Sequence, residues 1–419
     1  MKKIFLILIT LLLVFNTYVH ANPIDINGEA ALLVDADSNR ILYEKNMNKK
    51  MYPASTTKIM TAILAIEYGK MDEMVLADEE VISLTSGSHI ALDYDEEVRF
   101  EDLLNALLIA SGNDAALALG KHISGSIEGF VEAMNKKAKE LGALNTNYTN
   151  PHGLHHDNHY TTASDLYLIT TYAMKNDTFR EIIAKSSYKI PPTNKKDQER
   201  VMYTTNKFLY GNEKIYVDGK LVPIRYEGVA GVKTGNTNEA GRCFIGYSNR
   251  NGRNIYTIVL NSENAEVFAD TIKLMDYGFN NFFTFPIGNK NEFIDNVDIV
   301  NGNLPYASAV LESDVYYTLA NNESQKIEKK IKVNDELVAP ISKGDVLGKV
   351  EYYLGDDLIA EASIVSTISI ELVPSVKLIG ILLKRWYLVL LGLWLFFRVY
   401  VVVNKNIRRK RRKASYYRY

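Results

Sequence analysis

The residues best suited to chemistry begin with a serine and a lysine three positions apart. Ser55-Thr56-Thr57-Lys58 follows Pro53 and opens the apolar run Ile59–Leu64. Proline is favourable near a helix start, so Ser55 is expected in the first turn with Lys58 on the same face. A serine nucleophile needs a base, and a lysine serves only where burial or a second cation lowers its pKa. A capping serine with a solvated lysine explains the same four residues, so the pattern decides nothing alone.

Two further short motifs follow along the chain. Ser111-Gly112-Asn113 separates the apolar stretch Leu107–Ala110 from the helical run Asp114–Leu119. Lys233-Thr234-Gly235 is expected to end the strand-like segment Val229–Val232. Each has a local explanation, as a capped turn between helices and as a strand end with a turn glycine. Together they are a strong signal, because the order S-x-x-K, S-x-N, K-T-G is improbable by accident.

With these motifs the chain resembles the penicillin-binding serine D-Ala-D-Ala carboxypeptidases, from about Gly28 to Phe282. The segments that support the resemblance are Tyr52–Lys58, Ala110–Ala116, Asn150–Leu154, His159–Ala163 and Gly231–Gly235. It implies an α/β (α+β) catalytic domain of the β-lactamase/transpeptidase type. It also implies removal of the last D-alanine from peptidoglycan stem peptides through an acyl-enzyme, with β-lactams as covalent inhibitors and no cofactor.

The resemblance implies catalytic roles for residues of the first two motifs. Ser55 would be the nucleophile and Lys58 its general base. Ser111 would belong to the proton relay, and Asn113 would bind the substrate amide. Lys233 would keep Lys58 partly neutral by like-charge repulsion if the two lie close together.

The third motif would bind the end of the substrate. The resemblance implies that Lys233 and Thr234 hold the terminal carboxylate, which suits an ammonium and a hydroxyl. Backbone N–H groups of Ser55 and Asn236 would complete an oxyanion hole, with Gly235 allowing close approach. Relatives often have a larger or aromatic residue in place of Asn236, which leaves turnover rate and antibiotic sensitivity open.

Other functions remain as alternatives. A class A β-lactamase needs a further acidic residue on a loop, and no convincing match lies between Ser124 and Asp165. A D,D-endopeptidase acting on cross-linked peptidoglycan is the nearest enzymatic alternative. A non-catalytic penicillin-binding sensor or wall-binding protein is the alternative from another class, and the intact motifs weigh against it. Four histidines lie within His152–His159, but the surrounding glycine, proline and Asp-Asn predict a loop, so no metal site is expected.

An apolar segment lies near each end of the chain. Residues 1–21 have two lysines, a short apolar run and Val19-His20-Ala21, which together predict a cleaved export signal. Near the other end, residues 376–403 predict a membrane-anchoring segment with a span at about 386–403, and a helix lying on the membrane is the alternative. The basic tail, residues 404–419, predicts a cytoplasmic C-terminus and an extracytoplasmic catalytic domain on a single-pass protein.

The charge of the exported portion narrows the class of partner, and the cysteine count excludes one kind of covalent cross-link. Of the 48 basic residues, two precede residue 21 and eleven lie from Lys384 onward, which leaves 35 against all 50 acidic residues, a charge of about −15. An acidic exported portion argues against nucleic acid as a partner. The single cysteine, Cys243, excludes an intrachain disulfide and lies in a segment that predicts a buried strand.

The exported portion divides into two regions. Residues 22–282 are expected to be the catalytic domain, one mostly antiparallel sheet with helices on its faces. Its expected helices are Lys58–Tyr68, Phe100–Ala110, Asp114–Ser124, Ile127–Leu141, Ser164–Lys175 and Asn264–Gly278, and its expected strands include Gly228–Lys233, Cys243–Ser248 and Asn254–Asn261. Residues 287–373 alternate in short runs between turns and predict a small all-β domain. That domain either holds the enzyme off the membrane or contacts the wall.

Overall fold

The computed structural model describes residues 24–416, with side chains to Lys410 and gaps at 264, 322, 324–325, 375, 377–379 and 381–382. The expected export signal lies outside the described residues. The chain divides into two compact units with separate hydrophobic cores. The first ends at Thr284 and includes Thr318–Asn322, and the second comprises Phe285–Tyr317 and Glu323–Tyr419.

The first unit is organised around a five-stranded sheet in the order β2-β1-β11-β10-β9, in which every neighbouring pair is antiparallel. The strands are β1 (Ala30–Asp35), β2 (Ile41–Lys45), β9 (Val229–Thr237), β10 (Gly241–Arg250) and β11 (Arg253–Ser262). Asn251 and Gly252 both have positive φ in the turn between β10 and β11, as a two-residue hairpin requires. Strand β9 lies at one edge of the sheet, so its outer side has no partner strand among the described residues.

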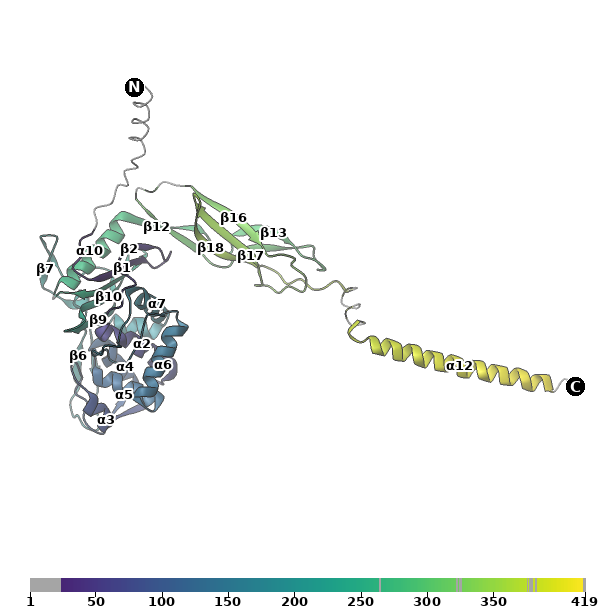
Figure 1. Ribbon diagram of the computed structural model, residues 1–419, viewed down its shortest axis with the longest axis horizontal. Coiled ribbons are helices and arrows are strands. Elements are labelled where there is room, and N and C mark those ends of the chain that lie inside the picture. Colours follow the sequence, from purple (N-terminus) through teal and green to yellow (C-terminus); the bar gives the residue numbers. More distant parts are fainter. Residues whose placement is uncertain are drawn as a thin grey trace, which may run out of the picture. The chain divides into compact units, whose positions relative to one another are not determined.

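Helices cover both faces of this sheet (Figure 1). Side chains alternate along β1: Leu32 and Val34 pack in one core, whereas Ala31 and Leu33 pack in another with α10. The first core is built with the helices α2 (Lys58–Tyr68), α4 (Phe100–Ile109), α5 (Asn113–Ser124), α6 (Ile127–Glu140) and α7 (Ala163–Ala173). Helix α10 (Glu266–Asn281) covers the opposite face. The expected antiparallel sheet with flanking helices is therefore confirmed.

Several short elements were not anticipated from the sequence. They are α3 (Glu79–Leu84), α8 (Asp177–Ile183), α9 (Lys207–Tyr210) and three two-stranded sheets of four-residue strands, β3 (Met74–Ala77) with β4 (Glu96–Arg99), β5 (Ser187–Ile190) with β6 (Arg200–Tyr203), and β7 (Lys214–Val217) with β8 (Lys220–Pro223). The expected end of a strand at Lys233 is wrong. Strand β9 continues to Thr237, because Lys233 pairs with Ile245 and Gly235 pairs with Cys243 on β10.

The second unit contains the predicted all-β region. Its five-stranded sheet has the order β13-β14-β18-β17-β16. These strands are β13 (Phe293–Asp298), β14 (Tyr306–Leu311), β16 (Ile327–Val333), β17 (Val346–Leu354) and β18 (Asp357–Ser366). Outside this sheet, β12 (Phe282–Gly288) pairs with β15 (Val315–Ala320), and the boundary between the two units falls within both strands. Buried Leu311, Val350 and Ile364 belong to the core of this unit.

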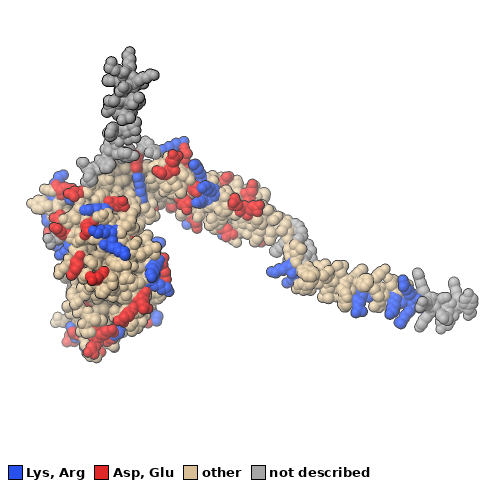
Figure 2. Space-filling model, viewed as in Figure 1, with Lys and Arg blue, Asp and Glu red and all other residues tan. Residues whose placement is uncertain are grey.

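One long apolar helix, α12 (Trp386–Tyr416), follows the β strands. An 18-residue window within Trp386–Lys410 has a mean hydropathy of 2.0, and the segment is long and apolar enough to cross a membrane. At about 1.5 Å per residue these 25 residues reach about 38 Å. Basic side chains gather toward the end of the helix, at Lys405 and Arg408–Lys410 (Figure 2).

Candidate active site

Ser55 lies in a short 3-10 helix, η1 (Ala54–Thr57), that leads directly into α2. Lys58 is the first residue of α2 and is completely buried, whereas Ser55 is partly exposed. The Lys58 Nζ atom lies 3.0 Å from Ser55 Oγ. The serine and the lysine are therefore in hydrogen-bond contact at the start of the helix that crosses the core.

Two other atoms contact the Lys58 amine: Asn113 Oδ1 at 2.6 Å and the His152 carbonyl oxygen at 2.8 Å. Asn113 Nδ2 donates to the Ser86 carbonyl at 2.6 Å, which orients the amide so that its oxygen faces the lysine. Both oxygens can only accept. A neutral amine has two hydrogens and one lone pair, so in that form the two acceptors would take both hydrogens and the lone pair would be left to accept from Ser55 Oγ–H.

Electrostatics favour this neutral amine. Burial is the main cause that lowers the pKa of Lys58 well below its usual value, and the charge of Lys233 lowers it further. Asp114 acts in the opposite direction. Its carboxylate accepts hydrogen bonds from the backbone N–H groups of Ile90 and Leu92, which fixes the preceding loop against α5. Lys58 therefore has the properties that a general base for serine requires.

The second motif lies at the turn between α4 and α5. Ser111 has a φ of 61°, in the left-handed region that serine seldom adopts. This turn directs the Ser111 hydroxyl to Lys233 Nζ, at 3.0 Å. Asn113 begins α5, and its backbone N–H donates to the Ser88 carbonyl at 2.7 Å. The first and second motifs thus meet through Asn113, and the second and third meet through Ser111.

The third motif lies on the edge strand β9. Lys233 is buried, and burial lowers its pKa to about 7. Its Nζ also contacts the Thr234 carbonyl oxygen at 3.1 Å. The Thr234 hydroxyl lies 2.5 Å from the hydroxyl of Thr205, which is exposed. Two hydroxyls with a buried amine beside them form a small site that suits a carboxylate.

Gly235 and Asn236 follow on the same strand. A Cβ atom on Gly235 would lie 3.0 Å from the Pro53 carbonyl oxygen and 3.2 Å from Ala54 Cβ. Glycine therefore lets β9 pack against the chain that positions Ser55. Asn236 is exposed on the strand, next to this contact.

Four groups that build the site had no role predicted from the sequence. The His152 carbonyl contacts Lys58, and Thr205 contacts Thr234. Gly153 has a φ of 89°, and a Cβ there would come within 1.8 Å of the Ala54 carbonyl oxygen. His159 Nε2 lies 2.9 Å from Thr57 Oγ1, and burial lowers the pKa of this imidazole to about 3. A neutral His159 therefore fixes the loop against η1.

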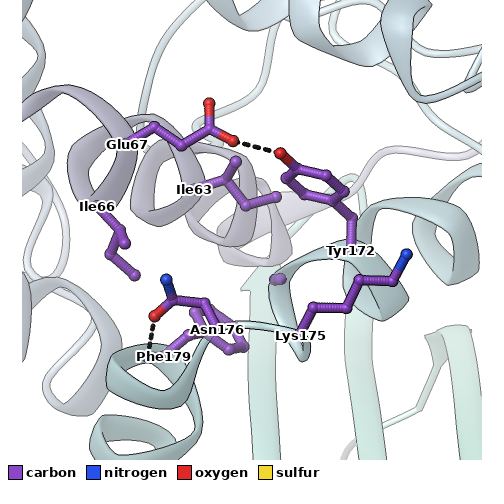
Figure 3. A pocket seen from close by; sticks show the side chains of 8 residues that line it. Ile63, Ile66, Glu67, Tyr172, Lys175, Asn176 and Phe179 are labelled. Atoms are coloured by element: carbon purple, nitrogen blue, oxygen red, sulfur yellow. Dashed lines mark hydrogen bonds between the residues drawn. The ribbon is translucent and has the colours of Figure 1, made fainter.

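A separate pocket of about 350 Å³ lies further along α2 (Figure 3). Ile63, Ile66 and Glu67 form one side, and residues of α7, of α8 and of the turn between them form the other. The Glu67 carboxylate accepts a hydrogen bond from the Tyr172 hydroxyl at 2.6 Å across this pocket. None of the residues that line it belongs to the three motifs.

Family comparison agrees with this arrangement. A family model described as D-alanyl-D-alanine carboxypeptidase matches residues 16–264, more than half of the chain. The chain belongs to this family. The carboxypeptidase is therefore a serine-type hydrolase of peptidoglycan metabolism. A second model, described as the C-terminal domain of penicillin-binding protein 5, matches residues 282–372.

Individual relatives extend the similarity over both regions. The carboxypeptidase is 31% identical to D-alanyl-D-alanine carboxypeptidase DacF of Bacillus subtilis, over 80% of this chain and 84% of the relative. It is 30% identical to D-alanyl-D-alanine carboxypeptidase DacA of Haemophilus influenzae, over 87% and 89%. Among solved structures, penicillin-binding protein 5 of Haemophilus influenzae matches with a TM-score of 0.70 at 26% identity, over 83% of this chain and 99% of that chain.

Proposed function

We propose that this carboxypeptidase removes the C-terminal D-alanine from peptidoglycan stem pentapeptides, with Ser55 as the nucleophile. The observation that supports these roles best is the environment of Lys58. Its buried amine has two acceptor-only neighbours and one hydroxyl neighbour, Ser55. That arrangement suits a neutral base that takes the serine proton.

The first half of the reaction forms the acyl-enzyme. Lys58 Nζ accepts the Ser55 hydroxyl proton while Oγ attacks the carbonyl carbon of the penultimate D-alanine. Backbone N–H groups of Ser55 and Asn236 donate to the developing oxyanion. The peptide C–N bond then breaks, and the leaving amine takes a proton that Lys58 passes on through the hydroxyl of Ser111. Free D-alanine departs, and the shortened peptide remains esterified to Ser55.

The second half releases the peptide. A water molecule gives a proton to Lys58 and attacks the ester carbonyl. The ester bond breaks, and Ser55 Oγ takes the proton back from Lys58. The neutral lysine and the free hydroxyl are thereby restored, so no cofactor is needed for the cycle.

Substrate binding follows from the edge position of β9. The terminal carboxylate would accept hydrogen bonds from Thr234 and Thr205, with the ammonium form of Lys233 buried beside them. The peptide would then lie along the unpaired side of β9 as an added antiparallel strand. Asn113, whose amide borders the base, would contact the substrate amide from the other side. β-Lactams would acylate Ser55 in the same position.

Membrane anchoring by α12 is supported by the length and composition of the helix. We further propose that the helix spans the membrane with its C-terminal end in the cytoplasm. Lys405 and Arg408–Lys410 follow the apolar stretch, and basic residues beside a span favour the cytoplasmic side. The catalytic domain would then face the wall.

The test is D-alanine release from a blocked Lys-D-Ala-D-Ala peptide by the full chain in detergent, with and without prior penicillin. Release that penicillin abolishes, and loss of both release and covalent penicillin labelling in Ser55→Ala, are expected. Labelling without release would favour an endopeptidase or a sensor instead. Absence of both signals in the unmodified chain would rule out the proposed reaction.

A further inference from the structure

A cavity of mixed charge lies beside the segment that leads to Ser55. It has a volume of about 340 Å³. The charged residues that line it are Glu29, Lys49, Lys50, Asp157 and Glu239, and Tyr52 and Tyr160 line it as well. No residue of the three motifs lines it, and the proposed mechanism assigns it no role.

The cavity adjoins the end of β9. Glu239 and Ala240 belong to the turn between β9 and β10, and Tyr52 precedes Ser55 by three residues. Cys243 Sγ lies 3.6 Å from the Ala240 carbonyl oxygen and 3.8 Å from the Tyr52 carbonyl oxygen. The turn and the Ser55 segment therefore meet at the wall of this cavity.

The direction of the bound peptide points to the same place. If the terminal carboxylate lies at Thr234 and the reacting carbonyl lies by Asn236, the peptide runs antiparallel to β9. The peptide residues upstream of the reacting carbonyl then lie toward the C-terminal end of β9. Each residue upstream advances about 3.3 Å along the strand. The residue before the two D-alanines then lies opposite Thr237 or Asn238, next to Glu239. This step rests on the proposed function, because it uses the substrate position given there.

Two opposite charges in the cavity, Lys50 and Glu239, make no hydrogen bond or ion pair in the part of the chain that the structure describes. Lys49 pairs with Glu29, and Asp157 Oδ1 lies 3.4 Å from His155 Nε2. Lys50 has only the ring of Tyr160, with Nζ 4.1 Å from the ring centroid. Glu239 is exposed and makes no hydrogen bond or ion pair with another described residue. A ligand group with one positive and one negative end would neutralise both.

We propose that this cavity binds the side chain of the residue before the two D-alanines, and that it favours a diamino diacid there. The ammonium of such a side chain would pair with Glu239, and its carboxylate would pair with Lys50. A side chain that ends in an ammonium alone, such as lysine, would satisfy Glu239 and leave Lys50 unpaired. An acylated lysine would satisfy neither charge.

Three peptides test this selectivity on the full chain in detergent. They are N-acetylated X-D-Ala-D-Ala, where X is meso-diaminopimelate, lysine or Nε-acetyl-lysine. The value of kcat/KM is expected to fall at each step in that order, by about two- to fivefold, as for a partly exposed ion pair. Both differences in kcat/KM between successive peptides should become smaller at high salt.

Two variants test whether each preference between peptides depends on one charged residue. Lys50→Met should abolish the preference for diaminopimelate over lysine, and Glu239→Gln should abolish the preference for lysine over acetyl-lysine. The matched controls, Lys139→Met and Glu132→Gln, change exposed charges on α6 and should leave both steps in place.

Two outcomes separate this inference from the proposed function. Release from all three peptides at equal kcat/KM, or steps that persist in Lys50→Met and Glu239→Gln, would overturn the subsite and leave the carboxypeptidase reaction standing. Release from none of the peptides would overturn the reaction, and the subsite with it.

Discussion

Replacement of Asn113 by aspartate tests whether Lys58 acts as a neutral base. The change keeps the size of the side chain but places a carboxylate where the amide oxygen now lies 2.6 Å from Lys58 Nζ. A carboxylate at that distance favours the ammonium form, so it raises the pKa of Lys58. The reaction needs the neutral form, and therefore activity at a given pH should fall.

The structure gives an upper bound for the size of this effect. Opposite charges 2.6 Å apart at an effective dielectric constant of about 20 attract by about 6 kcal/mol. That corresponds to about 4.5 pKa units, and the lost hydration of the buried carboxylate reduces it. Even a shift of two units lowers the neutral fraction about a hundredfold at pH values below the original pKa. The acid limb of the kcat/KM profile should move to higher pH.

The assay is D-alanine release between pH 6 and about pH 10, with the rate of penicillin acylation as a second readout of the same step. Asn105→Asp is the matched control. Asn105 is also buried, accepts from Lys185 Nζ at 3.0 Å and donates to the Glu101 carbonyl at 2.8 Å. The Asn105→Asp variant should be less stable than the native chain, but the acid limb of its kcat/KM profile should not move. An unchanged acid limb in folded Asn113→Asp would refute a neutral Lys58 as the base.

Three further predictions concern the surrounding groups. Gly153→Ala should lower stability by about 1–3 kcal/mol more than Gly125→Ala, measured by calorimetry, because both glycines have positive φ but only Gly153 faces a backbone oxygen. Equal losses would contradict the close contact. Thr205→Val should raise KM several-fold for a peptide with a free terminal carboxylate and leave KM unchanged for the corresponding amide; equal effects on both would argue against the carboxylate site. Since the pKa of Lys233 is lowered to about 7, its ammonium is lost as pH rises through that value, so KM for the free-carboxylate peptide should increase above about pH 7. A flat KM up to pH 9 would exclude a charged Lys233 from binding.

The strongest sequence signals came from residues whose chemistry and order are both unusual. The three motifs are 53 and 120 positions apart, from Lys58 to Ser111 and from Asn113 to Lys233, and the structure brings all three together. The long helices were also predictable, because their apolar residues repeat along one face. The four-residue strands of the three small two-stranded sheets were not, because so short a run shows no clear alternation.

The remaining parts of the site depend on the path of the backbone. The His152 group that contacts Lys58 is a carbonyl, which every residue possesses, so its side chain carries no sign of this contact. Thr205 lies in a segment without a recognisable motif, and only the fold places it beside Thr234. The extension of β9 through Lys233 was missed because Thr234 and Gly235 resemble a turn until their pairing with β10 is known.

Because Cys243 is buried, a cysteine introduced at the surface can be labelled selectively in the otherwise native chain. This thiol is 1% exposed, and burial raises its pKa to about 11, so maleimides at neutral pH should not modify it in the folded protein. A cysteine introduced at an exposed position would be the only reactive thiol, without prior removal of the native one. With Lys139→Cys and Lys405→Cys, a reagent that cannot cross lipid would report on intact wall-stripped cells which side of the membrane each position occupies.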